Sequence, residues 1–104
     1  MGYPMAGHLR RAGHAVTVFN RTRAVAERWT AEHGGAAAET PAAAAGRADV
    51  VFVCVGNDAD VRLVVTDSVG ALAGLRAGSV LVDHTTASAD LARELAQACA
   101  AQSC

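Results

Sequence analysis

VTVFNRT, the stretch from Val16 to Thr22, is a short run of β-branched and aromatic residues that ends abruptly in a polar turn. Such a run is typical of a β-strand, and the eleven residues that follow, up to His33, have the spacing of an amphipathic helix. The chain therefore passes from a strand directly into a helix at this turn. In sheets whose parallel strands alternate with helices, ligands bind outside the carboxyl ends of the strands. The turn at residues 20–22 is consequently the first candidate for a binding site.

Two further predicted strands end in the same way. Val50–Val55 is a run of six apolar residues, typical of a central parallel strand buried on both faces, and Gly56 begins the turn after it. Ser79–Val82 is the next expected strand, and Asp83 follows it. Because helical segments separate the strands, the sequence predicts right-handed crossovers and a mostly parallel sheet, that is, an α/β fold. The ends of the three strands should then line one edge of the sheet, where a dinucleotide would bind.

The other elements are marked by residues that begin or end them. Helices are expected over Tyr3–Ala12, Thr22–His33, a stretch that opens at Thr40-Pro41 and stops at Gly46, Ala59–Val65, and a last stretch capped by Ser88. Ala36–Ala38 is expected to be a short edge strand, and the passage punctuated by Gly70, Gly74 and Gly78 to be loop.

Composition places the chain among single globular domains. It has 104 residues, of which 52% are hydrophobic and 18% charged. The formal net charge of −1 argues against a nucleic-acid partner held by a basic face. No apolar run is long enough for a membrane span, and the N-terminus does not resemble a signal peptide, so we expect a cytoplasmic protein without a membrane partner.

Metal-binding and catalytic motifs are not evident in the sequence. The cysteines Cys54, Cys99 and Cys104 and the four histidines lack the spacing of metal ligands, so no metal site is expected. Asp58, Asp60 and Asp67 are interpreted as solvated surface residues. All nine basic residues are Arg, so the chain contains no Lys to act as a general acid or base.

The turn at residues 20–22 allows two interpretations. Arg21, with no Asp or Glu beside it, favours a 2′-phosphate over a free 2′-hydroxyl on the adenosine ribose of a dinucleotide. Alternatively, Asn20 and Thr22 only cap the helix and Arg21 is solvated.

Five short motifs, in order and at close to the same spacing, resemble the N-terminal domain of the β-hydroxyacid dehydrogenases, which include 3-hydroxyisobutyrate and 6-phosphogluconate dehydrogenases. The motifs are MGYPMA at Met1–Ala6, AGH at Ala12–His14, the Val16–Thr22 stretch, ADVV at Ala48–Val51, and DHTT at Asp83–Thr86. Met1–Ala6 is similar to the second half of the family signature G-L-G-x-M-G-x-P-M-A. The resemblance covers nearly all of the chain and implies a Rossmann-like parallel sheet with flanking helices.

The resemblance implies cofactor-binding residues, and NADP as the cofactor with NAD as the alternative. They are Met1, Gly2, Asn20, Arg21, Thr22, Val55, Gly56 and Thr86. Gly2 matches the third glycine of the phosphate-binding fingerprint, where helix N–H groups face the pyrophosphate. Val55 and Gly56 match positions whose backbone lies against the adenosine ribose. Thr86 matches a position that contacts the nicotinamide ribose or substrate; alternatively, it caps the following turn.

Two departures from the family bear on the expected function. The chain begins inside the signature, so the first strand and first two glycines are missing; we interpret Met1 as an internal methionine, or the gene as a fragment. Residues 1–104 would then be a partial NAD(P)-binding Rossmann domain. The helical domain that carries the family's substrate pocket and catalytic Lys is also absent, so no catalytic residue is expected here.

Two functions remain open. The first is the NADP(H)-binding portion of an oxidoreductase that transfers a hydride between nicotinamide and a small 3-hydroxy acid or its aldehyde. On this hypothesis the small hydroxy acid binds only the full-length protein, homo-oligomers form only if the C-terminal domain is present, and the chain itself is inactive. The second is a non-catalytic dinucleotide-binding module or a degenerate gene fragment.

Overall fold

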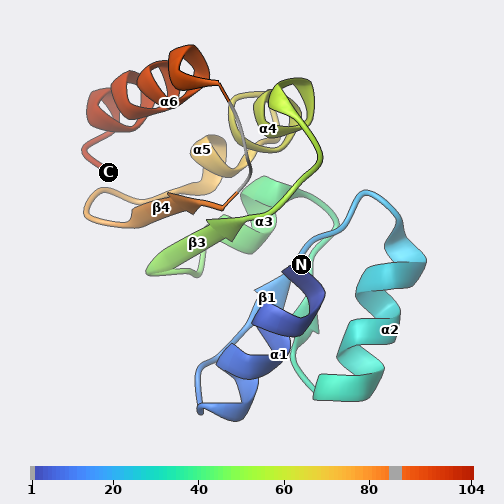
Figure 1. Cartoon of the computed structure of the whole chain (residues 1–104). Helices are drawn as coiled ribbons and strands as arrows, with labels where there is room; N and C mark the ends of the chain where they lie inside the picture. Colours follow the sequence, from blue (N-terminus) through green and yellow to red (C-terminus); the bar gives the residue numbers. More distant parts are fainter. Residues whose placement is uncertain (1, 85–87) are drawn as a thin grey trace.

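The computed structural model, which describes residues 2–84 and 88–104, is an α/β fold with two pairs of parallel strands (Figure 1). The strand β1 (Thr17–Val18) pairs with β2 (Ala36–Ala37), and β3 (Val50–Val53) pairs with β4 (Val80–Asp83). Within the described residues no ladder joins the two pairs. The predicted fold class, a Rossmann-like parallel arrangement with flanking helices, is confirmed, although β1 is shorter than the sequence predicts.

Six helices accompany the strands in the described residues, and two of them, those that follow Thr40 and Ser88, begin at the expected caps. They are α1 (Gly2–Arg11), α2 (Arg23–His33), α3 (Pro41–Ala45), α4 (Asp58–Val65), α5 (Ala71–Gly74) and α6 (Ala89–Ala101). The side chains of Thr40, Asn57 and Ser88 each accept a hydrogen bond from the N–H three residues later, at 3.1, 3.0 and 3.1 Å. Within the described part of the chain, no helix has the length and apolar character of a membrane span.

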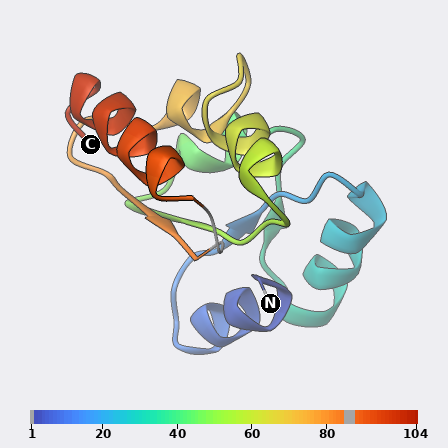
Figure 2. The same cartoon turned by 45° about the horizontal axis from the view of Figure 1, so that its top comes forward.

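The larger hydrophobic core lies between the β3–β4 pair and the last four helices, which gather on one side of that pair in Figures 1 and 2. Its members come from β3, α3, α4, α5, α6 and the segment after α5: Ala45, Val53, Val61, Val65, Ala71, Leu72, Leu75, Leu91 and Leu95, each less than 9% exposed. This core holds the first turns of α4 and α6 in fixed positions beside the ends of β3 and β4.

The prediction that β3 is buried on both faces is wrong. Successive side chains of a strand point to opposite faces, and the two faces of β3 differ. Val53 faces the core and is 6% exposed, whereas Val50 and Phe52 are 42% and 40% exposed. The face opposite the larger core is thus only partly covered, and Val80 on β4 is likewise 51% exposed.

The passage predicted as loop contains the short helix α5, which packs against α3 at backbone distance. A Cβ built on Gly74 would lie 2.0 Å from the carbonyl oxygen of Ala42. Glycine is therefore needed at residue 74 because the two helices touch there, and the sequence prediction of a loop was wrong.

A second, smaller core joins α1 to α2. Trp29 is 1% exposed, and its ring lies 5.3 Å from that of His33. A Cβ built on Gly7 of α1 would lie 2.6 Å from the His33 ring, so the absence of a side chain lets α1 approach α2. The Tyr3 hydroxyl also donates a hydrogen bond to Glu32, which raises the pKa of Tyr3. These contacts fix the first turn of α1 relative to α2.

Candidate functional site

Contacts between side chains bring together the turns that follow β1 and β3 and the start of α6. Arg21, after β1, lies 3.4 Å from Asp60 in the first turn of α4, measured between Nη1 and Oδ1. Asp58, also in that turn, accepts hydrogen bonds from Ser88 at the start of α6. A Cβ on Gly2, at the start of α1, would lie 3.3 Å from the Cβ of Cys54 after β3. Four segments far apart in the sequence thus meet at the carboxyl ends of the strands, as a ligand crevice of an α/β sheet requires.

The turn after β1 is built by Asn20. Its side-chain oxygen accepts a hydrogen bond from the N–H of Thr22 at 2.8 Å, which closes the turn. Thr22 is the N-cap residue of α2, yet its side chain makes no capping hydrogen bond. Thr22 therefore occupies the capping position of α2, but its hydroxyl does not cap the helix.

Arg21 and Arg23 differ in how strongly other side chains hold them. Arg23 donates to Glu27 at 3.0 Å and to Glu39 at 3.1 Å, and these two carboxylates, Glu27 first, raise the pKa of its guanidinium. Arg21 has one longer contact, with Asp60, and its side chain is 75% exposed. An exposed ion pair contributes little free energy, so the Arg21 guanidinium is the more accessible of the two to an incoming anion.

The turn after β3 is stabilised by the cap of α4. The Asn57 side chain accepts a hydrogen bond from the N–H of Asp60 at 3.0 Å. A Cβ built on Gly56 would lie 2.9 Å from Oδ2 of Asp60. The missing side chain at Gly56 thus makes room for the Asp60 carboxylate, a contact that the sequence did not suggest.

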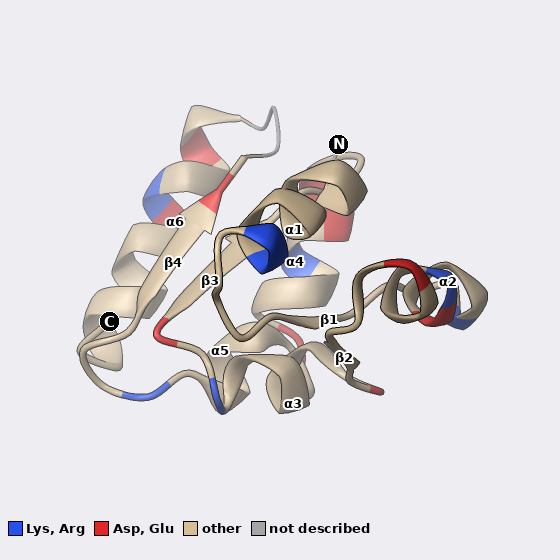
Figure 3. Ribbon diagram, turned by 90° about the horizontal axis from the view of Figure 1, so that it is seen from below, with Lys and Arg blue, Asp and Glu red and all other residues tan. Residues whose placement is uncertain are grey.

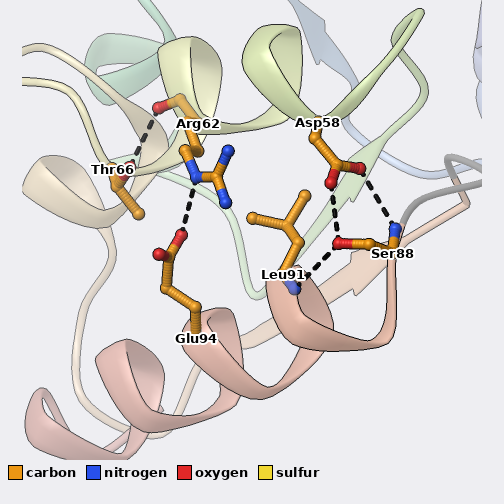
Figure 4. A network of polar contacts seen from close by, with 6 residues as sticks. All are labelled: Asp58, Arg62, Thr66, Ser88, Leu91 and Glu94. Carbon is orange, nitrogen blue, oxygen red and sulfur yellow. Dashed lines mark hydrogen bonds and ion pairs between the residues drawn. The ribbon is translucent and has the colours of Figure 1, made fainter.

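The link between α4 and α6 is a pair of hydrogen bonds to one carboxylate (Figure 4). The Ser88 hydroxyl donates to Asp58 at 2.7 Å and its N–H donates at 3.1 Å. These two bonds lower the pKa of Asp58. The same hydroxyl accepts the N–H of Leu91, so Ser88 caps α6 and ties it to α4 at once. Further along the same two helices, Arg62 pairs with Glu94 at 3.0 Å.

The first turn of α1 offers a positive electrostatic environment. This first turn contains no acidic residue, and the last turn of α1 carries His8, Arg10 and Arg11. The charged side chains of α1 therefore do not oppose the helix dipole. In Figure 3 the basic colour on α1 is confined to the last turn. The start of α1 lies against Cys54, so its N–H groups are placed beside the end of β3.

The predicted site residues fall into two groups. Gly2, Asn20, Arg21, Thr22, Val55 and Gly56 belong to the segments just described, whereas Met1 and Thr86 lie outside the described residues. Sequence reasoning missed Asp58 and Asp60, which it took for solvated surface residues. Both lie within three residues after Asn57, which caps α4 in the turn that follows β3. A capping residue after a strand is a sequence signal for a helix start, and this signal would have placed both carboxylates near the end of β3. Among the described residues, no group of three or more His, Cys, Asp or Glu side chains is arranged to hold a metal.

Comparison with known proteins finds similarity to an NAD-binding domain and to oxidoreductases. The model of a family described as the NAD binding domain of 6-phosphogluconate dehydrogenase matches residues 1–104. An uncharacterized oxidoreductase of Shewanella frigidimarina is 58% identical over 96 residues, which are 92% of this chain and 33% of that protein. The probable 3-hydroxyisobutyrate dehydrogenase-like 1, mitochondrial, of Arabidopsis thaliana is 48% identical over 105 residues, covering 100% of this chain and 31% of that one.

A solved structure described as Psf3 in complex with NADP+ and 2-OPP has the same fold, with a TM-score of 0.89 and 30% sequence identity. The superposition covers 99% of this chain and 36% of that one. The chain thus spans about a third of the length of these three proteins.

Proposed function

Because the chain belongs to the family of the NAD-binding domain of 6-phosphogluconate dehydrogenase, we propose that it binds NADP(H) as the cofactor-binding part of an oxidoreductase. The observation that carries this proposal is the exposed Arg21 guanidinium at the end of β1, in contact with the first turn of α4. A guanidinium suits a 2′-phosphate, to which it donates two parallel hydrogen bonds.

Each part of the crevice is assigned one part of the dinucleotide. The N–H groups at the start of α1, around Gly2, bind the pyrophosphate; the absence of acidic residues from this turn supports the assignment. Asn20, Arg21 and Thr22 surround the 2′-phosphate, and the backbone of Val55 and Gly56 lies against the adenosine ribose. Met1 and Thr86 are assigned to the cofactor by resemblance alone.

When bound, the nicotinamide accepts or donates a hydride. The substrate in this proposal is a small 3-hydroxy acid or the corresponding aldehyde, bound by a part of the protein other than residues 1–104. The chain contains no Lys, so it supplies no lysine for general acid or base catalysis. The 104-residue chain is therefore expected to bind the cofactor without turning over substrate, as a non-catalytic dinucleotide-binding module would.

We also propose that the sheet is completed by one more strand, between β1 and β3. Among the described residues, β1 pairs only with β2 and β3 only with β4, so each strand has a second edge available for pairing. A parallel strand there would join the two pairs into one sheet. An N-terminal extension of β-branched residues followed by G-x-G should raise the midpoint of urea unfolding, whereas a scrambled extension should not. Equal midpoints for the two extensions would contradict the proposal.

The cofactor assignment is tested by titrating NADP+ and NAD+ into the wild-type chain and into Arg21→Gln. Hydrogen bonds to charged groups contribute about 1.5–3 kcal/mol, so the substitution should weaken NADP+ binding roughly 10- to 100-fold and leave NAD+ nearly unchanged. Arg47→Gln, which removes the same charge in the turn after α3, is the matched control. An equal loss of affinity for both cofactors in Arg21→Gln, or no loss for either, would refute the role of Arg21.

A further inference from the structure

We propose that Asp60 sets the preference between NADP and NAD by competing with the 2′-phosphate for Arg21. The inference rests on the proposed function, since it takes Arg21 as the residue that meets the 2′-phosphate. It adds a specificity-determining carboxylate on α4, a helix to which no part of the cofactor was assigned.

The geometry fixes Asp60 more firmly than Arg21. Its Oδ1 lies 3.4 Å from Nη1 of Arg21, and its side chain is 28% exposed against 75% for Arg21. The N–H of Asp60 is held by the cap at Asn57, and its Oδ2 occupies the space that a Cβ on Gly56 would need. The carboxylate thus has a defined position over the turn after β3, while the guanidinium reaches it from the other side of the crevice.

This arrangement penalises a 2′-phosphate in two ways. The Arg21 guanidinium must break its contact with Asp60, or bind both anions at once, in order to donate two hydrogen bonds to the phosphate. In addition, a phosphate bound to Arg21 lies close to the Asp60 carboxylate, and like charges repel. The ion pair is exposed, so the exchange weakens NADP binding without abolishing it.

A free 2′-hydroxyl avoids both penalties. It carries no charge, and it is able to donate a hydrogen bond to a carboxylate oxygen. Asp60 therefore shifts the balance from NADP towards NAD, in opposition to Arg21. The preference depends on this pair rather than on Arg21 alone.

The neighbouring carboxylates have other partners. Asp58 accepts two hydrogen bonds from Ser88. Glu27 and Glu39 each accept a hydrogen bond from the guanidinium of Arg23. Asp60 is the carboxylate for which the described residues give a contact with Arg21.

The test compares dissociation constants of NADP+ and NAD+ for the wild-type chain, Asp60→Asn and Arg21→Gln. Asn is isosteric with Asp and leaves the backbone N–H bonded to the cap, and circular dichroism verifies that each variant is folded. Removing one negative charge a few ångströms from the phosphate should tighten NADP+ binding roughly three- to tenfold, with NAD+ unchanged or weaker. Asp67→Asn, with the same change of charge beyond the other end of α4, should change neither constant.

The outcomes separate the two proposals. If Arg21→Gln lowers the affinity for NADP+ selectively while Asp60→Asn leaves the ratio of the two constants at its wild-type value, the role of Asp60 is overturned and the proposed function stands. If Arg21→Gln does not alter the ratio, or the wild type binds neither cofactor, the proposed function fails and the role of Asp60 fails with it. A similar tightening in Asp67→Asn would also overturn the role of Asp60, because it would assign the effect to net charge.

Discussion

Replacing Gly74 by alanine should destabilise the chain because it pushes α5 away from α3. The ideal Cβ would lie 2.0 Å from the carbonyl oxygen of Ala42, whereas ordinary contacts begin at 3.4 Å, so α5 must move by roughly 3.4 − 2.0 = 1.4 Å. The neighbouring atoms are backbone and have no rotamer that relieves the contact. The movement would also disturb Ala71 and Leu72, which are 3% and 6% exposed in the larger core. Overpacking of this kind costs typically 1–3 kcal/mol, and the size of the overlap places Gly74→Ala at about 2–3 kcal/mol.

For a domain of this size, that loss corresponds to a melting temperature lowered by roughly 8–24 °C. Thermal and urea unfolding followed by far-UV circular dichroism measure it. Gly46→Ala is the matched control, because Gly46 has a right-handed φ of −60° and the nearest atom to its ideal Cβ is 3.6 Å away. The control should be as stable as the wild type or more stable, by up to about 1 kcal/mol. If Gly74→Ala unfolds with the control, the close contact of α3 and α5 does not contribute as argued.

Substitutions at three further positions probe the helices α3, α4 and α6. Hydrogen bonds from Ser88 lower the pKa of Asp58 below its ordinary value of 3.8, so their contribution to stability is present above that value and is lost as the pH falls through the lower folded-state pKa. The urea midpoints of wild type and Asp58→Asn should therefore differ at neutral pH and converge in acid; a constant difference would contradict this. Thr40→Ala, which removes the cap bond to the N–H of Ala43, should cost about 1 kcal/mol in urea unfolding, and Thr40→Ser should restore most of it. Leu91→Ala, at a fully buried position, should cost about 2–5 kcal/mol by the same measurement, and a loss below 1 kcal/mol would mean that α6 does not pack as described.

Local signals predicted most of the secondary structure because they act within a few residues. Thr40-Pro41 and Ser88 begin helices since their side chains accept N–H groups one turn later, whatever the rest of the chain does. Ala36–Ala38 was predicted as a short strand, and β2 forms over two of these three residues. The order of strands and polar turns was therefore predictable without knowledge of the packing.

Features that depend on partners distant in sequence could not be predicted in this way. The six apolar residues from Val50 give no sign that one face of β3 is partly exposed, because burial depends on which helices reach that face. Gly74 looks like a loop residue until Ala42 is seen beside it. The contact between Arg21 and Asp60 joins residues 39 positions apart, and no local pattern encodes it.

The first turn of α4 connects the two sides of the crevice because of its periodicity. Side chains two positions apart on a helix point in very different directions, so Asp58 and Asp60 contact different neighbours: Ser88 at the start of α6 and Arg21 after β1. Both connections are made by carboxylates, although the proposed ligand is an anion. The positive potential that such a ligand needs must then come from Arg21 and from the N–H groups at the start of α1, where no acidic side chain opposes the helix dipole. On the proposed function, affinity for a dinucleotide is thus a balance between two cationic elements and the two carboxylates of one helical turn. Of the two carboxylates, Asp60 contacts a cationic element directly, so its substitution should shift this balance more than that of Asp58.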